Sequence, residues 1–323
     1  MEGGWIDKMV DISFIVLTYN PEWNQLIITL KSLIVQKNVN FEIVISDDGS
    51  KINYNDKLKK FFMDNNFTNY KFLNHSNNVG TCQNVYDGVK EATGKVVKLI
   101  SPGDFLYCEN IIYKWLQFLN DRKYDICFGK FIAYSKDSDD YNIIKVLEKP
   151  QLQGCYLKDN NYRSRKIACF LTYDMPIGAT FIVNRELFIK YLSKIVGKVK
   201  YAEDFAYRLM VLDDIILGMY DKPVIFYEYG TGISTVKSGI WIKRLDDDLK
   251  QLKNIIIENT NDNIGFNSKY KKFLLINNKI KKMIYAVFYF PECLFRKIGL
   301  AISRKKTTTN TQASFLEQEI ICK

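Results

Sequence analysis

Three short apolar runs, each followed at once by a polar turn, constrain the fold of this chain more than any other feature. Each run has the length and the β-branched residues that are typical of a buried strand. Segments with helical spacing of their apolar residues separate the runs, so the sequence predicts an α/β fold with a mostly parallel, doubly wound, Rossmann-like sheet. The runs are residues 11–17, 41–46 and 96–100, and the turns after them read TYN, DDGS and SPGD.

These turns predict a ligand site. The carboxyl ends of parallel strands lie at one edge of a sheet, and open α/β folds bind ligands there. Thr18, Tyr19, Asp48 and Asp104 would meet at that edge. Two alternatives remain open, because Asp104 could cap a helix predicted at residues 109–119 and D-G-S is itself an ordinary turn sequence. No turn is a glycine-rich phosphate loop, so a nucleotide would be held by carboxylates, hydroxyls and an aromatic face.

The pattern is looser after residue 120. Residues 135–166 are polar and irregular, and we expect a flap or an acceptor-facing loop there. The pair Glu203-Asp204 precedes a helix predicted at residues 205–212, and an Asp in that place could be its N-cap. The acidic run at residues 246–248 is interpreted as a solvated helix face. Further strands are predicted at residues 124–134, 181–183 and 224–229.

The charge of the chain is concentrated in one segment. The formal net charge is +10, from 46 Lys and Arg against 36 Asp and Glu. Residues 269–306 contain 11 Lys and Arg and one acid, Glu292, which leaves 35 basic and 35 acidic residues elsewhere. Aromatic and aliphatic residues between these lysines suit peripheral contact with an anionic membrane and not nucleic acid. The alternative is a helical pair, divided at Pro291, that packs on the body with its lysines in water.

The sequence also bears on the compartment. We see no signal peptide, and the longest apolar run, residues 283–290, is too short to span a bilayer. The seven cysteines form no C-x-x-C pair, which favours reduced thiols and the cytoplasm. A single histidine excludes a His-based zinc site.

The motifs together resemble a known family. In this order, the T-Y-N turn, the D-D-G-S turn, an N-x-G loop at residues 78–80, the acidic turn and the later E-D pair are similar to the family 2 glycosyltransferases that build bacterial capsules, lipopolysaccharides and surface glycans. The resemblance covers about residues 11–240 and implies the GT-A fold. It implies a nucleotide-sugar donor, a UDP-sugar above all, and a glycan or polyprenyl-diphosphate-linked acceptor at the cytosolic face of the bacterial inner membrane.

The resemblance implies roles for single residues. Asp204 would be the general base that takes the proton of the acceptor hydroxyl in an inverting transfer, with Glu203 and Trp241 at the acceptor. Asp104 matches a metal ligand of the family's D-x-D region and would hold Mg²⁺ or Mn²⁺ on the donor diphosphate. The donor would be bound by Thr18, Tyr19, Asn20, Glu22, Asp48, Asn78, Gly80, Ser101, Gly103, Asp104 and Lys237.

One departure from the family pattern keeps an alternative open. Ser101 and Gly103 stand where the D-x-D region carries further carboxylates. A non-catalytic glycan-binding or assembly subunit that retains the fold is therefore the second hypothesis. For either function we expect a catalytic-type domain at residues 1–240, with a donor half at 11–120 and an acceptor half at 121–240. A basic helical membrane segment at 241–306 and a disordered tail at 307–323 would follow it.

Overall fold

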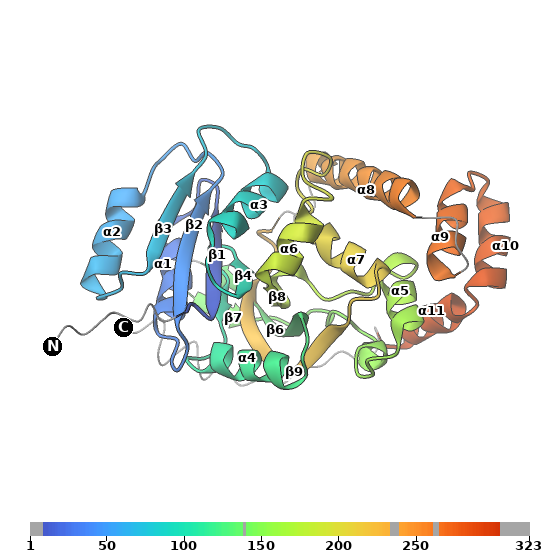
Figure 1. The fold of residues 1–323 in the computed structure, drawn as a ribbon, viewed down its shortest axis with the longest axis horizontal. Coiled ribbons are helices and arrows are strands. Elements are labelled where there is room, and N and C mark those ends of the chain that lie inside the picture. The colour runs from blue at the N-terminus through green and yellow to red at the C-terminus, as the bar shows by residue number, and fades with distance from the viewer. Residues whose placement is uncertain (1–8, 138–139, 233–238, 261–264, 304–323) are drawn as a thin grey trace.

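The fold is described from a computed structural model, which defines residues 9–137, 140–232, 239–260 and 265–303. Four parallel strands form one half of its sheet (Figure 1). In the register, Thr18 lies opposite Asp47 and Val16 lies opposite Ile100, so the predicted turns do follow neighbouring strand ends. In spatial order, these strands are β3 (Tyr70–Asn74), β2 (Phe41–Asp47), β1 (Ile12–Thr18) and β4 (Val96–Ile100).

Helices cover both faces of this half, because alternate strand residues are apolar on both sides. Ile15 of β1 packs in one core with α3 (Thr81–Glu91), whereas Phe14 and Val16 pack in a second core on the other face. The second core contains residues of α1 (Trp23–Ile34), α2 (Asn55–Asp64) and α4 (Ile111–Asp121). The predicted α/β class, with a Rossmann-like arrangement, is confirmed.

The other half of the sheet is mixed. The strand order is β3-β2-β1-β4-β8-β6-β9-β5, with β7 paired to β6 off this path, and β8 is antiparallel to both β4 and β6. Residues 135–166 are more regular than we expected. They contain the end of β6, the hairpin strand β7, a short 3₁₀ helix η1 (Gln153–Cys155) and α5 (Tyr162–Phe170). The strands of this half are β5 (Phe105–Leu106), β6 (Ile126–Asp137), β7 (Asp140–Ile143), β8 (Phe181–Asn184) and β9 (Leu217–Glu228).

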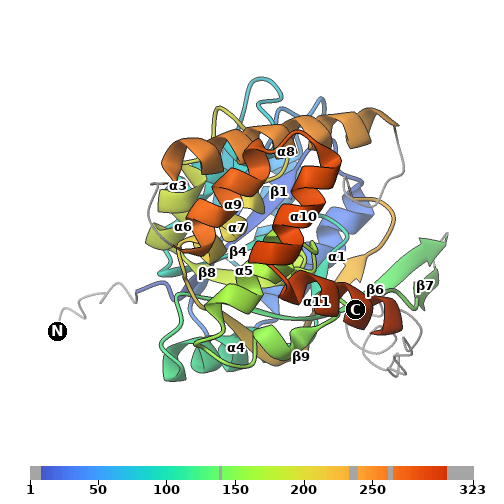
Figure 2. The ribbon, with the colours of Figure 1, turned by 90° about the vertical axis from the view of Figure 1, so that its right-hand side faces the viewer.

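Helices dominate the rest of the described chain. Figure 1 shows α9, α10 and α11 at the end of the molecule opposite α2 and β3, and Figure 2 looks at this end directly. Pro291 separates α10 from α11, as predicted. No helix among the described residues is long and apolar enough to cross a bilayer. These helices are α6 (Arg185–Leu192), α7 (Phe205–Leu212), α8 (Gly239–Asn259), α9 (Phe266–Leu275), α10 (Lys279–Tyr289) and α11 (Glu292–Ser303).

Candidate active site

The ends of β1 and β2 are tied together by the D-D-G-S turn. Asp47 accepts hydrogen bonds from the Thr18 hydroxyl at 2.8 Å and from the Ser50 hydroxyl at 2.6 Å. Asn20 joins the same turn, because its backbone N–H donates to the Ser50 hydroxyl at 2.7 Å. Tyr19, between Thr18 and Asn20 in the sequence, has 54% of its surface exposed. Its ring is therefore free to stack on a ligand and is not a packed strand-end aromatic. Glu22, at the start of α1, is exposed as well.

Asp48 fixes the N-x-G loop. Its carboxylate accepts from the backbone N–H of Val79 at 2.6 Å, from that of Gly80 at 3.2 Å and from the side-chain amide of Asn78 at 2.9 Å. Burial raises the pKa of Asp48, and the two backbone donors oppose the rise. The side chain is thus a buried carboxylate whose charge is stabilised by hydrogen bonds. Asp48 and Asn78, which we predicted at the donor, lie in one network.

The same loop contacts the segment that precedes the E-D pair. Gly80 has φ +93°, and a Cβ at this position would lie 2.6 Å from the Lys200 side chain. The Cys82 N–H, at the start of α3, donates to the Lys200 carbonyl at 3.0 Å. These contacts bring the Glu203-Asp204 pair to the edge at which β1 and β2 end.

Asp248 of α8 holds that segment from the other side. Its buried carboxylate accepts from the backbone N–H groups of Lys200, Tyr201 and Ala202 at 2.9, 2.7 and 3.0 Å. We expected residues 246–248 to form a solvated face. That prediction is wrong for Asp248, because its position on α8 faces the body and backbone donors offset the burial of its charge.

Glu203 and Asp204 form a partly buried acidic pair. Asp204 is the N-cap residue of α7, as the alternative predicted, but its side chain makes no capping hydrogen bond and is not used to hold the helix end. Burial raises the pKa of Asp204, and the Arg208 guanidinium opposes the rise. Burial, the Asp204 carboxylate and the Asp248 carboxylate together raise the pKa of Glu203 to about 8. A carboxylate with a raised pKa and no capping hydrogen bond has the properties of a general base.

A buried lysine links this pair to β4. The Lys98 ammonium donates to the carbonyls of Leu99 at 2.7 Å and of Ala179 at 2.6 Å. Ala179 belongs to the 3₁₀ helix η2 (Gly178–Thr180), and a Cβ at Gly178 would lie 3.5 Å from a Glu203 carboxylate oxygen. Burial lowers the pKa of Lys98 and raises that of Asp104, and each charge opposes the shift of the other. Lys98 therefore interacts both with Asp104, in the acidic turn after β4, and with η2, the short helix that lies next to Glu203.

Asp104 does not cap a helix. Asn110 is the N-cap residue of α4, while an Asp104 oxygen accepts from the Glu228 N–H at 3.0 Å. The cap alternative for Asp104 is therefore wrong. Gly103, beside it, is buried against Glu228 at the end of β9, and Ser101 is exposed. Gln25 of α1 donates to both Glu228 carboxylate oxygens, at 2.9 and 2.8 Å.

The predicted acceptor residue Trp241 lies at the start of α8. Its ring makes an edge contact with Tyr201 at 5.1 Å between centroids, and the Arg244 guanidinium lies 4.6 Å from the Trp241 ring centre. Trp241 contacts Tyr201, and Tyr201 lies two residues before Glu203. Trp241 is therefore near the E-D pair. Lys237, which we predicted at the donor diphosphate, lies outside the described residues.

Four residues of this site were missed by sequence reasoning. Lys98 lies inside an apolar strand and was read only as part of it, and Asp248 was read as solvated. Gln25 and Glu228 meet across 203 positions of sequence, so no local pattern connects them. A charge within a buried strand was the one available signal, and Lys98 carries it.

Comparisons with known proteins agree with this fold. The sequence model of glycosyl transferase family 2 matches residues 13–192, which is more than half of the chain. Crystal structures of S. aureus TarS 1-349 have a similar fold: the complex with UDP-GlcNAc at 17% identity and a TM-score of 0.56, and the complex with UDP at 17% and 0.55. Each comparison covers 87% of this chain and 73% of that one. No curated protein matches in sequence. The family match, over the strands and turns described above, shows that this chain belongs to glycosyl transferase family 2.

Proposed function

We propose that this glycosyltransferase moves a sugar from a nucleotide-sugar, a UDP-sugar, to a hydroxyl of a surface-glycan or polyprenyl-diphosphate-linked acceptor, with inversion. One observation carries the proposal. Asp204 is a carboxylate without a capping hydrogen bond, and it lies close to Cys82 at the start of α3, next to the N-x-G loop that Asp48 of the D-D-G-S turn holds. Inversion in a single step needs a base for the acceptor and a stabilised leaving group, but no covalent nucleophile.

In this mechanism Asp204 takes the acceptor proton as the hydroxyl oxygen attacks the anomeric carbon. Its raised pKa makes it a stronger base than an exposed aspartate. Glu203, with a pKa of about 8, is mainly protonated at neutral pH and can donate a hydrogen bond to the acceptor. Trp241, held between Tyr201 and Arg244, offers an aromatic surface for an acceptor sugar.

The donor would lie along the strand ends. Tyr19 offers an exposed ring for the base, and Thr18, Asn20 and Asp48 hold the two turns beside it. The complexes of TarS with UDP and UDP-GlcNAc support a uridine nucleotide. Glu22, Asn78, Gly80 and Ser101, which are also at this edge of the described chain, remain proposed donor contacts.

A divalent cation, Mg²⁺ or Mn²⁺, fits next to Asp104. No group of three or more His, Cys, Asp or Glu side chains that could hold a metal occurs among the described residues. Asp104 would be the protein ligand, a carboxylate of the kind that hard cations prefer, and the Glu228 carboxylate is near enough to interact with it electrostatically. A bound cation would neutralise the charge that develops on the leaving nucleoside diphosphate.

A donor titration tests the proposed function. Thermal shift would be measured with UDP-, GDP- and dTDP-sugars, each with and without Mn²⁺. We expect stabilisation by the UDP-sugars, because a ligand that binds only the folded state raises its stability. A protein that no nucleotide-sugar stabilises would instead support the non-catalytic subunit.

We further propose that α10 and α11 rest on an anionic bilayer at the cytosolic face of the bacterial inner membrane. Phe288 is 80% exposed and Phe295 is 75% exposed, and α10 has no buried residue. The exposed apolar residues recur at helical spacing, as on an interfacial helix. They are Ile280, Met283, Ile284, Val287 and Phe288 on α10, and Leu294, Phe295, Ile298 and Ile302 on α11.

The lysines on α10 and α11 favour binding to an anionic surface. Lys279, Lys281 and Lys282 lie in the first turn of α10, and Lys297 is exposed on α11. Near an anionic leaflet each such charge contributes about 1 kcal/mol of binding. Lys279 and Lys281 flank the exposed apolar residues of α10, whereas Lys282 lies over the Phe273 ring of α9.

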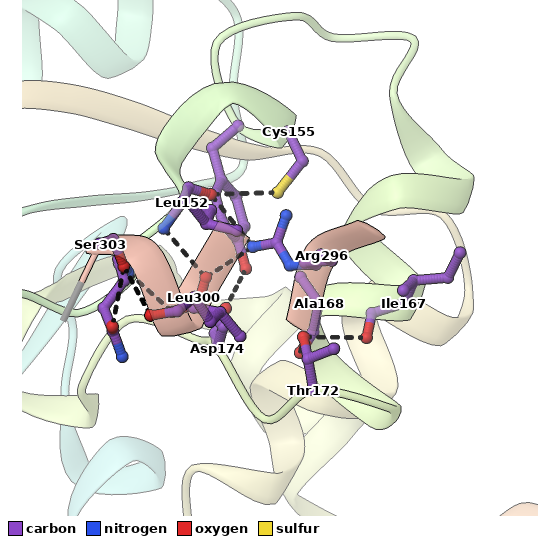
Figure 3. Close-up of polar contacts among 11 residues, drawn as sticks. Leu152, Cys155, Ile167, Ala168, Thr172, Asp174, Arg296, Leu300 and Ser303 are labelled. Atoms are coloured by element: carbon purple, nitrogen blue, oxygen red, sulfur yellow. Dashed lines mark hydrogen bonds and ion pairs between the residues drawn. The ribbon is translucent and has the colours of Figure 1, made fainter. Parts of the chain in front are cut away.

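The opposite side of α11 is locked to the body (Figure 3). The Arg296 guanidinium donates to Asp174 at 2.6 Å and to the Leu152 carbonyl at 3.0 Å, and the Asp174 side chain is 1% exposed. Arg163 of α5 binds Glu292, at the start of α11, through two hydrogen bonds of 2.6 and 3.1 Å. The apolar face therefore points away from the body.

Vesicle flotation tests the membrane proposal. We expect the protein to float with phosphatidylglycerol vesicles and not with phosphatidylcholine vesicles, and the double variant Phe288→Ser/Phe295→Ser to lose this binding. Met63→Ser, on α2 at the other end and 69% exposed in the parent, is the matched control. A dimer that forms without lipid, and that the double variant abolishes, would identify the face as a contact between copies instead.

A further inference from the structure

We propose that Glu228, at the end of β9, supplies the carboxylate that residue 103 lacks and is a ligand of the divalent cation on the donor diphosphate. The inference rests on the proposed function, because it needs a nucleoside diphosphate in the site. It assigns a role to a residue that belongs to none of the motifs in the sequence.

Residue 103 has neither the backbone conformation nor the space for a side chain. The backbone of Gly103 has φ +99°, which disfavours any L side chain. A Cβ built there would lie 2.1 Å from the Glu228 Oε2 atom. That separation is shorter than any non-bonded contact, so the Glu228 carboxylate occupies the volume that an aspartate side chain at 103 would fill. The carboxylate expected in the acidic turn is therefore present, but it comes from a different strand.

Glu228 is held in this place from several directions. Its backbone N–H donates to Asp104, and Gln25 donates to both of its carboxylate oxygens. The Tyr134 hydroxyl donates to the Gly103 carbonyl, which fixes the turn against β9. Only 7% of Glu228 is exposed. A side chain held in this way keeps one geometry, as a metal ligand must.

The charges around Glu228 also favour a cation. The Asp104 and Glu228 carboxylates are near enough to interact electrostatically, and Lys98 and Lys136 offset their negative charges only in part. Two neighbouring carboxylates repel each other, and a divalent cation between them and a diphosphate relieves that repulsion.

A neutral, nearly isosteric variant separates a metal ligand from a structural group. Mn²⁺ binding to Glu228→Gln would be measured by electron paramagnetic resonance, with and without UDP, and UDP binding by calorimetry without metal. Asp221→Asn, an exposed carboxylate on the same strand, is the matched control. We expect Glu228→Gln to weaken Mn²⁺ binding in the presence of UDP by about 10- to 100-fold. Metal-free UDP affinity and the circular dichroism spectrum should be unchanged.

A swap variant guards against a general structural defect. Gly103→Asp alone would place its side chain on Glu228, so we expect it to be unstable. In Gly103→Asp/Glu228→Gly the space is cleared and one carboxylate returns from the turn, but the positive φ at residue 103 still disfavours a side chain, so its Mn²⁺ binding is compared only if circular dichroism shows that it folds. We expect this double variant to bind Mn²⁺ with UDP more tightly than Glu228→Gln does.

The outcomes are distinguishable. Unchanged Mn²⁺ binding in a folded Glu228→Gln overturns the assignment of Glu228 and leaves the proposed function intact. UDP binding by the parent that is indifferent to Mn²⁺ overturns it as well. A parent that binds neither UDP nor Mn²⁺ overturns the proposed function, and the assignment with it.

Discussion

The candidate site contains two acidic pairs, Asp47-Asp48 and Glu203-Asp204, and the hydrogen-bond donors around the two pairs differ. In the D-D-G-S turn, Asp47 and Asp48 accept hydrogen bonds from hydroxyl, amide and backbone donors. The Glu203 and Asp204 carboxylates accept none from other residues of the described chain, and Asp204 leaves its own helix uncapped. Burial is the largest cause of the raised pKa at Asp48 and at Glu203. The next largest causes differ, because the Val79 and Gly80 backbone donors lower the pKa of Asp48, whereas the Asp204 carboxylate raises that of Glu203.

The difference separates two uses of a buried carboxylate. A carboxylate that accepts several hydrogen bonds is stabilised as an anion and positions the groups that donate to it. A carboxylate without such donors costs stability and remains available to take a proton from a substrate. This contrast supports the proposal that the first pair belongs to the framework of a donor site and that the second pair takes part in catalysis.

The largest effect should come from Asp204→Asn. The amide cannot accept the acceptor proton, so we expect kcat to fall by about 10²- to 10⁴-fold. UDP affinity should be unchanged, since Asp204 lies at the acceptor side of the proposed site. Initial rates of sugar transfer and calorimetry with UDP would measure the two quantities. Full turnover in this variant would remove the catalytic assignment.

Asp48→Asn should do the reverse. The variant loses one acceptor for the backbone N–H groups of residues 79–80, and we expect the free energy of unfolding to fall by about 1–3 kcal/mol. UDP binding should weaken because the N-x-G loop is no longer fixed. Urea denaturation and UDP titration give both values. If Asp48→Asn lowered kcat while leaving UDP affinity and stability intact, the contrast between the two pairs would be wrong.

The smallest effect concerns pH. Glu203 has a pKa near 8 in the folded protein and an ordinary value of 4.5 when exposed. Between these values the folded state holds a proton that the unfolded chain has lost, so the free energy of unfolding falls as pH rises through this window. Glu203→Gln removes this contribution. We expect its stability to depend less on pH than that of the parent, in denaturation series from about pH 5 to 8. Equal slopes would show that Glu203 does not titrate with a raised pKa.

The strand ends could be predicted from sequence because contiguous apolar residues mark β1, β2 and β4. Their turns follow at once, and the register of a parallel sheet places them together. The family pattern added the E-D pair. The sequence predicted where the turn residues and the E-D pair lie. Their roles remain proposals.

Other parts could not be predicted, for physical reasons. In α5, Arg165 and Lys166 are buried, so the segment shows no apolar periodicity and was predicted to be irregular. Arg165 donates hydrogen bonds to backbone carbonyls, and Lys166 donates to Asp214. Asp214 is far from Lys166 in sequence and comes near it only in the folded chain. The Asp248 contacts and the Gln25–Glu228 contact also join distant segments, and such pairs leave no local trace.

The lock on α11 has a consequence for the acceptor. Asp174, which binds Arg296, precedes by four positions the helix η2 whose Gly178 lies against Glu203. If the exposed face of α11 rests on a bilayer, one short segment sets both the level of the lipid headgroups and the position of the base. The enzyme would then work at a fixed height above the membrane and select lipid-linked acceptors by how far their reactive hydroxyl stands from it.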